Sequence, residues 1–113
     1  MIRAAAGTPA AAAVAAEPDC LGIVLGGSGN GEQIAANKVP GVRTALAYTA
    51  ETAELGRRHN DAQVVAIGSR MTSETDAKQI VRIFLTTPFS GEQRHQRRLD
   101  LIAAFERDGR LPE

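Results

Sequence analysis

The stretch at residues 26–31, Gly-Gly-Ser-Gly-Asn-Gly, constrains the fold of this 113-residue chain more than any other feature. A short apolar run at 21–25 precedes it, and the residues that follow suit a helix. Glycine adopts positive φ and lets a ligand approach the backbone, so the N–H groups of such a loop and of the next helix can face an anion. Glu32 starts that helix. It is either an ordinary first-turn acid, which suits the helix dipole, or a base beside an anion site.

Apolar runs alternate with helical patterns along the whole chain, which predicts βαβ units and a parallel sheet. The fold class expected is therefore α/β, a three-layer Rossmann-like parallel sheet with flanking helices. Three strands are fewer than the five or six of a doubly wound sheet. We therefore expect residues 10–113 to form a single partial domain, after an irregular N-terminus at 1–9. Strands are expected at 21–25, 42–47 and 63–68, and helices at 10–16, 32–38, 50–58, 74–86 and 91–107.

The composition argues against two classes of partner, nucleic acids and membranes. Acidic and basic residues balance at 13 each, and only 4 residues are aromatic (three Phe, one Tyr). Neither feature suits a nucleic-acid surface, and no apolar run approaches the ~20 residues of a membrane span. Cys20 is the only cysteine, so no internal disulfide can form, and a reducing cytoplasm fits.

Five motifs extend the glycine stretch into a wider pattern. They are Gly-Ile-Val-Leu-Gly-Gly-Ser-Gly-Asn-Gly-Glu at 22–32, Ala-Asn-Lys-Val-Pro-Gly-Val-Arg at 36–43, Arg-His-Asn-Asp-Ala at 58–62, Ile-Gly-Ser-Arg at 67–70 and Arg-His-Gln-Arg-Arg at 94–98. Together they resemble the type B ribose-5-phosphate isomerases, of the family that includes allose- and galactose-6-phosphate isomerases. The resemblance implies aldose–ketose isomerisation through an enediolate, with ribose 5-phosphate and ribulose 5-phosphate as the pair, in the pentose phosphate pathway. It implies no metal and no organic cofactor.

The resemblance also assigns roles to residues at matching positions. Glu32 would be the base, helped by the Ser28 hydroxyl, and His59 would open the sugar ring. The developing oxyanion and the sugar would be contacted through Gly27, Gly29, Asn30, Gly31 and Asn60. The phosphate would be bound by Arg70, Arg94 and Arg98. Arg94 and Arg98 are four residues apart and share a helix face, and guanidinium groups bind phosphate bidentately. His95 beside them either assists the phosphate or is simply exposed.

Topology separates two of these groups. In a parallel α/β sheet the glycine loop lies at the carboxyl edge, where ligands bind. His59 lies in a helix-to-strand connection, which belongs to the opposite edge. We therefore expect a neighbouring subunit to supply His59 to Glu32, as in the homodimer with shared active sites that the resemblance implies.

One feature of the family is not found in this sequence. The family begins with a βαβ unit whose first strand ends in an Asp-His pair, and no such unit is recognisable before residue 10. The chain is thus expected to be an N-terminally truncated member with the first βαβ unit missing. Two other functions stay open: a catalytically inactive remnant that binds phosphate or only dimerises, and a flavodoxin-like nucleotide-binding module.

Overall fold

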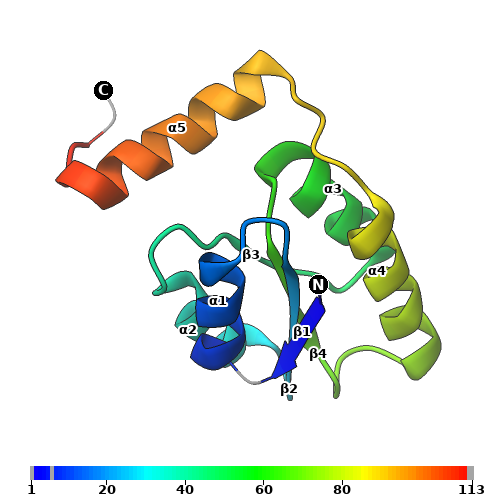
Figure 1. Ribbon diagram of the computed structural model, residues 1–113. Coiled ribbons are helices and arrows are strands. Elements are labelled where there is room, and N and C mark those ends of the chain that lie inside the picture. Colours follow the sequence, from blue (N-terminus) through cyan, green and yellow to red (C-terminus); the bar gives the residue numbers. More distant parts are fainter. Residues whose placement is uncertain (1, 6, 112–113) are drawn as a thin grey trace.

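A four-stranded parallel sheet forms the centre of the molecule (Figure 1). The computed structural model describes residues 2–5 and 7–111. Its strands lie in the order β1-β2-β4-β3. The elements along the chain are β1 (Ile2–Ala5), α1 (Gly7–Ala16), β2 (Leu21–Gly26), α2 (Asn30–Asn37), β3 (Thr44–Leu46), α3 (Ala50–Asn60), β4 (Val64–Gly68), α4 (Glu74–Thr86) and α5 (Gln93–Asp108).

Helices cover the sheet in two layers. The chain runs along the sheet from β1 through β2 to β3 and then turns back to β4. Right-handed crossovers place α1 and α2 on one face and α3 and α4 on the other, and the helices of each pair pack together. This reversal makes β2 and β4 neighbours whose following helices lie on opposite faces of the sheet. Such a switch point opens a crevice at the carboxyl ends of the two strands, where α/β proteins bind ligands.

Small side chains allow the layers to pack closely. On the α1 and α2 side the core is built around Val14, Val24 and several alanines. On the α3 and α4 side Ile67, Ile80 and Phe84 are the large buried side chains. Every residue of β4 is buried, which makes it the central strand on which both clusters pack.

The sequence predicted the main elements correctly. The α/β class, the parallel sheet and all three expected strands are confirmed, with β2, β3 and β4 close to the expected ranges. The expectation of an irregular segment at 1–9 is wrong where the structure describes it. Residues 2–5 form β1, in register with β2 from Ile2 opposite Leu21, and α1 already begins at Gly7. Four residues are too few to show a periodicity, so only pairing with β2 defines this strand.

The first βαβ unit of the chain is therefore β1–α1–β2, of which the β1 residues carried no strand signal. No Asp-His pair follows β1, since the sequence continues from Ala5 with Ala and Gly. Within the described ranges, no helix is both long and apolar enough to cross a membrane.

The last helix, α5, lies apart from the two layers. Figure 1 shows it extending from the amino-terminal end of the sheet, away from the body of the molecule. It packs on α3, and the Glu106 carboxylate accepts a hydrogen bond of 2.6 Å from the Gly41 N–H of the α2–β3 loop. Its buried residues are His95 and Leu99.

Candidate active site

The glycine loop joins β2 to α2 through a residue that only glycine suits. Gly29 precedes α2 with φ 86°, in the left-handed region. A Cβ there would lie 2.9 Å from Leu46 Cδ1 and 3.2 Å from Gly68 N. The first N–H groups of a helix have no intrahelical partner. The Asn30 N–H instead donates to Ser28 Oγ at 3.2 Å. The loop thus directs the start of α2 toward the carboxyl edge of the sheet.

The Glu32 side chain turns back over the end of β2. A Cβ added to Gly26 would overlap the Glu32 carboxylate, so this carboxylate lies directly against the loop backbone. The residue is half-buried. An acid that only complemented the helix dipole would need no such contact. The position fits the second interpretation of Glu32, a base beside an anion site.

The loop after β4 is hydrogen-bonded to the glycine loop. The Ser69 N–H donates to the Gly26 carbonyl at 2.7 Å, and the Arg70 N–H donates to the Gly27 carbonyl at 3.0 Å. The Arg70 guanidinium carbon is 3.4 Å from the place where a Cβ on Gly27 would stand. The β2–β4 switch point therefore brings Glu32 and Arg70 to the same edge, each fixed to the same loop.

Tyr48 is a member of this edge that the sequence interpretation missed. Its hydroxyl donates to the Ser28 carbonyl at 2.9 Å, which ties the end of β3 to the glycine loop. One feature of the sequence could have identified Tyr48 as a site residue. Tyr48 is the only tyrosine of the chain and directly follows a predicted strand, the position at which α/β proteins place ligand-facing residues.

We predict that Gly68→Ala lowers the free energy of unfolding by about 1–3 kcal/mol, because a new methyl group must displace packed backbone. The carbon of the Ser28 carbonyl is 2.6 Å from the ideal Cβ position at Gly68. Urea unfolding followed by circular dichroism measures the effect. The matched control is Gly31→Ala, where no atom lies within 4 Å of the new Cβ. Alanine favours the helix there, so stability should be unchanged or higher. Equal losses in the two variants would contradict the packing described.

The remaining predicted site residues lie at the opposite edge. His59 and Asn60 end α3, and Arg94 and Arg98 lie on α5. Figure 1 shows α5 at the end of the sheet remote from the loop that follows β2. The predicted separation of Glu32 from His59 is thus confirmed. One copy of the chain does not bring Ser28, Glu32 and Arg70 together with the α3 and α5 residues.

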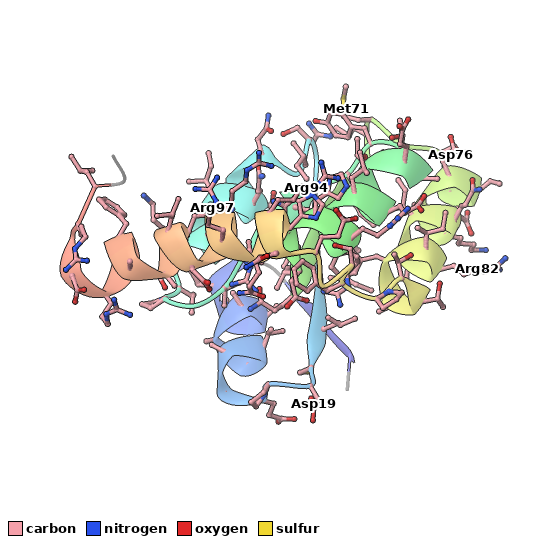
Figure 2. All side chains as sticks on the ribbon, turned by 90° about the horizontal axis from the view of Figure 1, so that it is seen from above. Asp19, Met71, Asp76, Arg82, Arg94 and Arg97 are labelled. Atoms are coloured by element: carbon pink, nitrogen blue, oxygen red, sulfur yellow. The ribbon has the colours of Figure 1, made fainter. Side chains whose placement is uncertain are left out.

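Arg94 and Arg98 are both exposed. Arg94 Nε is 2.8 Å from Glu92 Oε2, and this hydrogen bond and the Arg94 charge lower the pKa of the Glu92 carboxyl. Figure 2 shows Arg94 and Arg97 along α5, which is nearest the viewer. Both line a shallow hollow with Gln93, Gln96 and Asp100. A phosphate dianion could take the place of the Glu92 carboxylate at Arg94, since a guanidinium can donate two parallel hydrogen bonds to either group.

His95 is not exposed, which corrects one of the two alternatives given for it. Only 4% of its surface is accessible. Its ring lies on the His59 ring with centroids 4.1 Å apart. Burial lowers the pKa of His95, and the charges of His59 and Arg94 lower it further. Sequence alone could not show this, because the helix around His95 is strongly polar.

Among the residues that the structure describes, no group of three or more His, Cys, Asp or Glu side chains is placed to hold a metal ion. The chemistry available at the glycine loop is that of a carboxylate, hydroxyls, a guanidinium and backbone N–H groups. Such a set can move a proton and stabilise an oxyanion.

Comparison with known proteins gives consistent results. The family described as Ribose/Galactose Isomerase matches residues 4–102. The ribose-5-phosphate isomerase B of Mycolicibacterium paratuberculosis is 59% identical over 103 residues, which cover 91% of this chain and 65% of the relative. The chain thus spans just under two thirds of the length of this curated relative.

Solved structures agree with the sequence match. The type B ribose 5-phosphate isomerase from Trypanosoma cruzi superposes with a TM-score of 0.86 at 47% identity, over 88% of this chain and 67% of that one. The Mycoplasma genitalium ribose-5-phosphate isomerase B, solved with bound ribulose-5-phosphate, superposes with a TM-score of 0.85 at 40% identity. The superposition covers 89% of this chain and 66% of that one. The resemblance stated from the sequence motifs is confirmed.

Proposed function

The chain belongs to the ribose/galactose isomerase family, and on this premise we propose that it interconverts an aldose phosphate and a ketose phosphate. The proposed pair is ribose 5-phosphate and ribulose 5-phosphate, as in the pentose phosphate pathway. The observation that carries the proposal is the Glu32 carboxylate, packed on the loop backbone at Gly26 rather than extended into solvent. A relative with 40% identity has been solved with ribulose-5-phosphate bound, which supports the choice of substrate.

In the proposed reaction Glu32 removes the proton from C2 of the open-chain aldose. The C2–H electron pair forms the C1–C2 double bond, and the negative charge develops on O1. We assign the stabilisation of this oxyanion to N–H groups of the glycine loop and to the Ser28 hydroxyl, because fixed donors stabilise the transition state most where charge develops. Glu32 then returns the proton to C1 while the O2 hydroxyl proton moves to O1, which leaves the ketone at C2. No atom is gained or lost, and neither a metal nor an organic cofactor is needed.

A second copy of the chain completes the proposed site. Ring opening requires an acid–base group at the ring oxygen, and the resemblance gives this role to His59, with Asn60 contacting the sugar. Both lie at the edge opposite Glu32 within one copy. An isologous homodimer could bring the amino edge of one copy to the carboxyl edge of the other and would form two equal sites. An exposed apolar face on α5 supports association, because Leu101, Ile102, Phe105 and Leu111 line a shallow groove there.

The phosphate would be clamped from both copies. Arg70 lies at the same edge as Glu32, whereas Arg94 and Arg98 would come from the second copy on α5. Guanidinium groups suit a phosphate dianion because each can donate two parallel hydrogen bonds. We place the enzyme in the cytoplasm, where a buried thiol such as that of Cys20 stays reduced. We expect neither nucleic acid nor membrane as a partner.

The sequence that follows β1 supports a second candidate function, phosphate binding or dimerisation without turnover. This strand lies beside the glycine-loop strand, and no Asp-His pair follows it, although the resemblance places such a pair near the sugar phosphate. A chain without it could bind phosphate or dimerise without turnover. Conversion of ribose 5-phosphate by the 113-residue chain separates the two functions. Ribulose 5-phosphate formation supports the isomerase. Binding of substrate without product would establish the inactive remnant and contradict the proposed activity.

We predict that Arg94→Ala raises KM for ribose 5-phosphate about 10- to 100-fold, the equivalent of losing one charged hydrogen-bonding group worth about 1.5–3 kcal/mol. Steady-state kinetics measures it. The control is Arg82→Ala, which removes the same charge from an exposed site on α4, away from Arg94 (Figure 2). If both variants raised KM equally, the effect would come from net charge, and Arg94 would not be a phosphate ligand.

A further inference from the structure

His59 and His95 form a closed cluster with the loop between α4 and α5. The Ser90 N–H donates to the Arg58 carbonyl at 3.1 Å, immediately before His59 in the chain. The Ser90 hydroxyl is 3.1 Å from His95 Nδ1. The His95 ring then lies on the His59 ring, with an angle of 32° between their planes. The contacts thus form a closed circuit that runs from the end of α3 to the α4–α5 loop, on to α5 and back to α3.

The Ser90 hydroxyl takes part in two hydrogen bonds, one to the backbone of the following loop and one to His95. Ser90 Oγ accepts the Glu92 N–H at 3.2 Å, which uses one of its acceptor positions. It still has one acceptor position and its own proton, so the tautomer of His95 sets the direction of the 3.1 Å hydrogen bond between Ser90 Oγ and His95 Nδ1. Burial keeps the pKa of His95 low. The titratable groups that face it are His59, Arg94 and Arg98, with the Glu92 carboxylate opposing them. His95 is therefore a buried ring, fixed by Ser90, beneath a half-buried His59.

We infer that His95 is the positioning residue of His59, because its buried ring holds the His59 imidazole in one orientation and the Ser90 hydroxyl holds His95 in turn. This inference rests on the proposed role of His59 in ring opening. His59 is the penultimate residue of α3, and helix ends fray. Misplacing an acid–base group by about 1 Å can cost a factor of about 10² in rate.

A buried histidine that served only to fill the core would act differently. Its ring would contact apolar side chains, and its replacement by phenylalanine or by asparagine would leave the His59 imidazole unaffected. Here the neighbour is a second imidazole, and Ser90 links the two rings through both its backbone and its side chain.

Two variants separate the ring stack from the hydrogen bond. His95→Phe keeps an aromatic ring against His59 and loses the bond to Ser90, whereas His95→Asn keeps a polar group and loses the ring. The chain has only two histidines, so each variant shows a single imidazole Cε1–H signal in a ¹H–¹³C NMR spectrum, that of His59. We expect this signal to stay displaced by the ring current in His95→Phe. In His95→Asn it should move to the position of a mobile imidazole.

Kinetics adds a second readout. His95→Asn should lower kcat about tenfold with KM unchanged, and His95→Phe should restore most of it. Gln79→Ala, at an exposed position on α4 outside the proposed site, is the control that should change neither readout. A His59 signal that is the same in His95→Asn as in the unchanged chain would overturn the inference. So would a His95→Phe spectrum identical to that of His95→Asn.

If circular dichroism shows that His95→Asn does not fold, Ser90→Ala tests the inference in its place. It leaves both rings present and removes the bond to Nδ1, so both imidazole signals should shift together. A shift of the His95 signal alone would refute the coupling. The spectra need no turnover, so an inactive parent chain would defeat the proposed function while the positioning is still measured.

Discussion

Glu32→Gln is expected to lower kcat for the isomerisation of ribose 5-phosphate by about 10²–10⁴-fold, with KM nearly unchanged. The amide has the shape of the carboxylate but cannot take a proton from C2. Ground-state binding would persist, because the phosphate and the sugar hydroxyl groups are bound by other residues. Equilibrium unfolding should shift little, since the introduced amide side chain can occupy the same space beside Gly26.

The matched control for this variant is Glu74→Gln. Glu74 also lies in the first turn of a helix, α4, but its side chain is 84% exposed and pairs with Lys78. The same chemical change there should alter kcat by less than about twofold, as is usual for exposed residues away from a site. Equal losses in the two variants, or full activity in Glu32→Gln, would remove Glu32 from the role of base.

The sequence predicted those parts of the fold whose signals are local. The apolar spacing from Ala77 to Leu85 predicted α4, and an unbroken apolar run predicted β4, which is buried throughout. The glycine stretch predicted a turn with a left-handed residue, found at Gly29. The opposite placement of Glu32 and His59 followed from a general rule on parallel sheets and needed no coordinates.

The parts that could not be predicted depend on contacts between distant segments. Four residues gave no strand period, and β1 exists through its pairing with β2. The contact of the Glu32 carboxylate with Gly26 depends on the exact path of the loop. His95 sits in a polar helix, and its burial comes from α3, where His59 lies far earlier in the chain. Side-chain placement of this kind is set by tertiary packing, which overrides local pattern.

The second large effect concerns the composite site. His59→Ala is expected to lower kcat about 10²-fold, the usual contribution of a general acid–base group. In the proposed dimer each site combines Glu32 of one copy with His59 of the other. A mixed dimer of Glu32→Gln and His59→Ala chains therefore has one site with both defects and one site with none.

Mixing the two inactive variants after subunit exchange should restore activity. Equal amounts give about half mixed dimers with one intact site each, so the mixture should reach about one quarter of the parent activity. A chain carrying both substitutions, mixed with itself, is the control and should stay inactive. Size-exclusion chromatography of the mixture confirms that the chains are dimeric under the assay conditions.

This mixing experiment tests most directly whether the site is shared between two copies, with the base at the glycine loop of one and the ring-opening histidine at α3 of the other. We predict recovery to about one quarter of the activity of the parent chain, which requires both the turnover and the shared geometry. If the dimeric mixture showed only the sum of the two residual activities while the parent chain turned over substrate, Glu32 and His59 would not act across a dimer, and the shared site would be refuted.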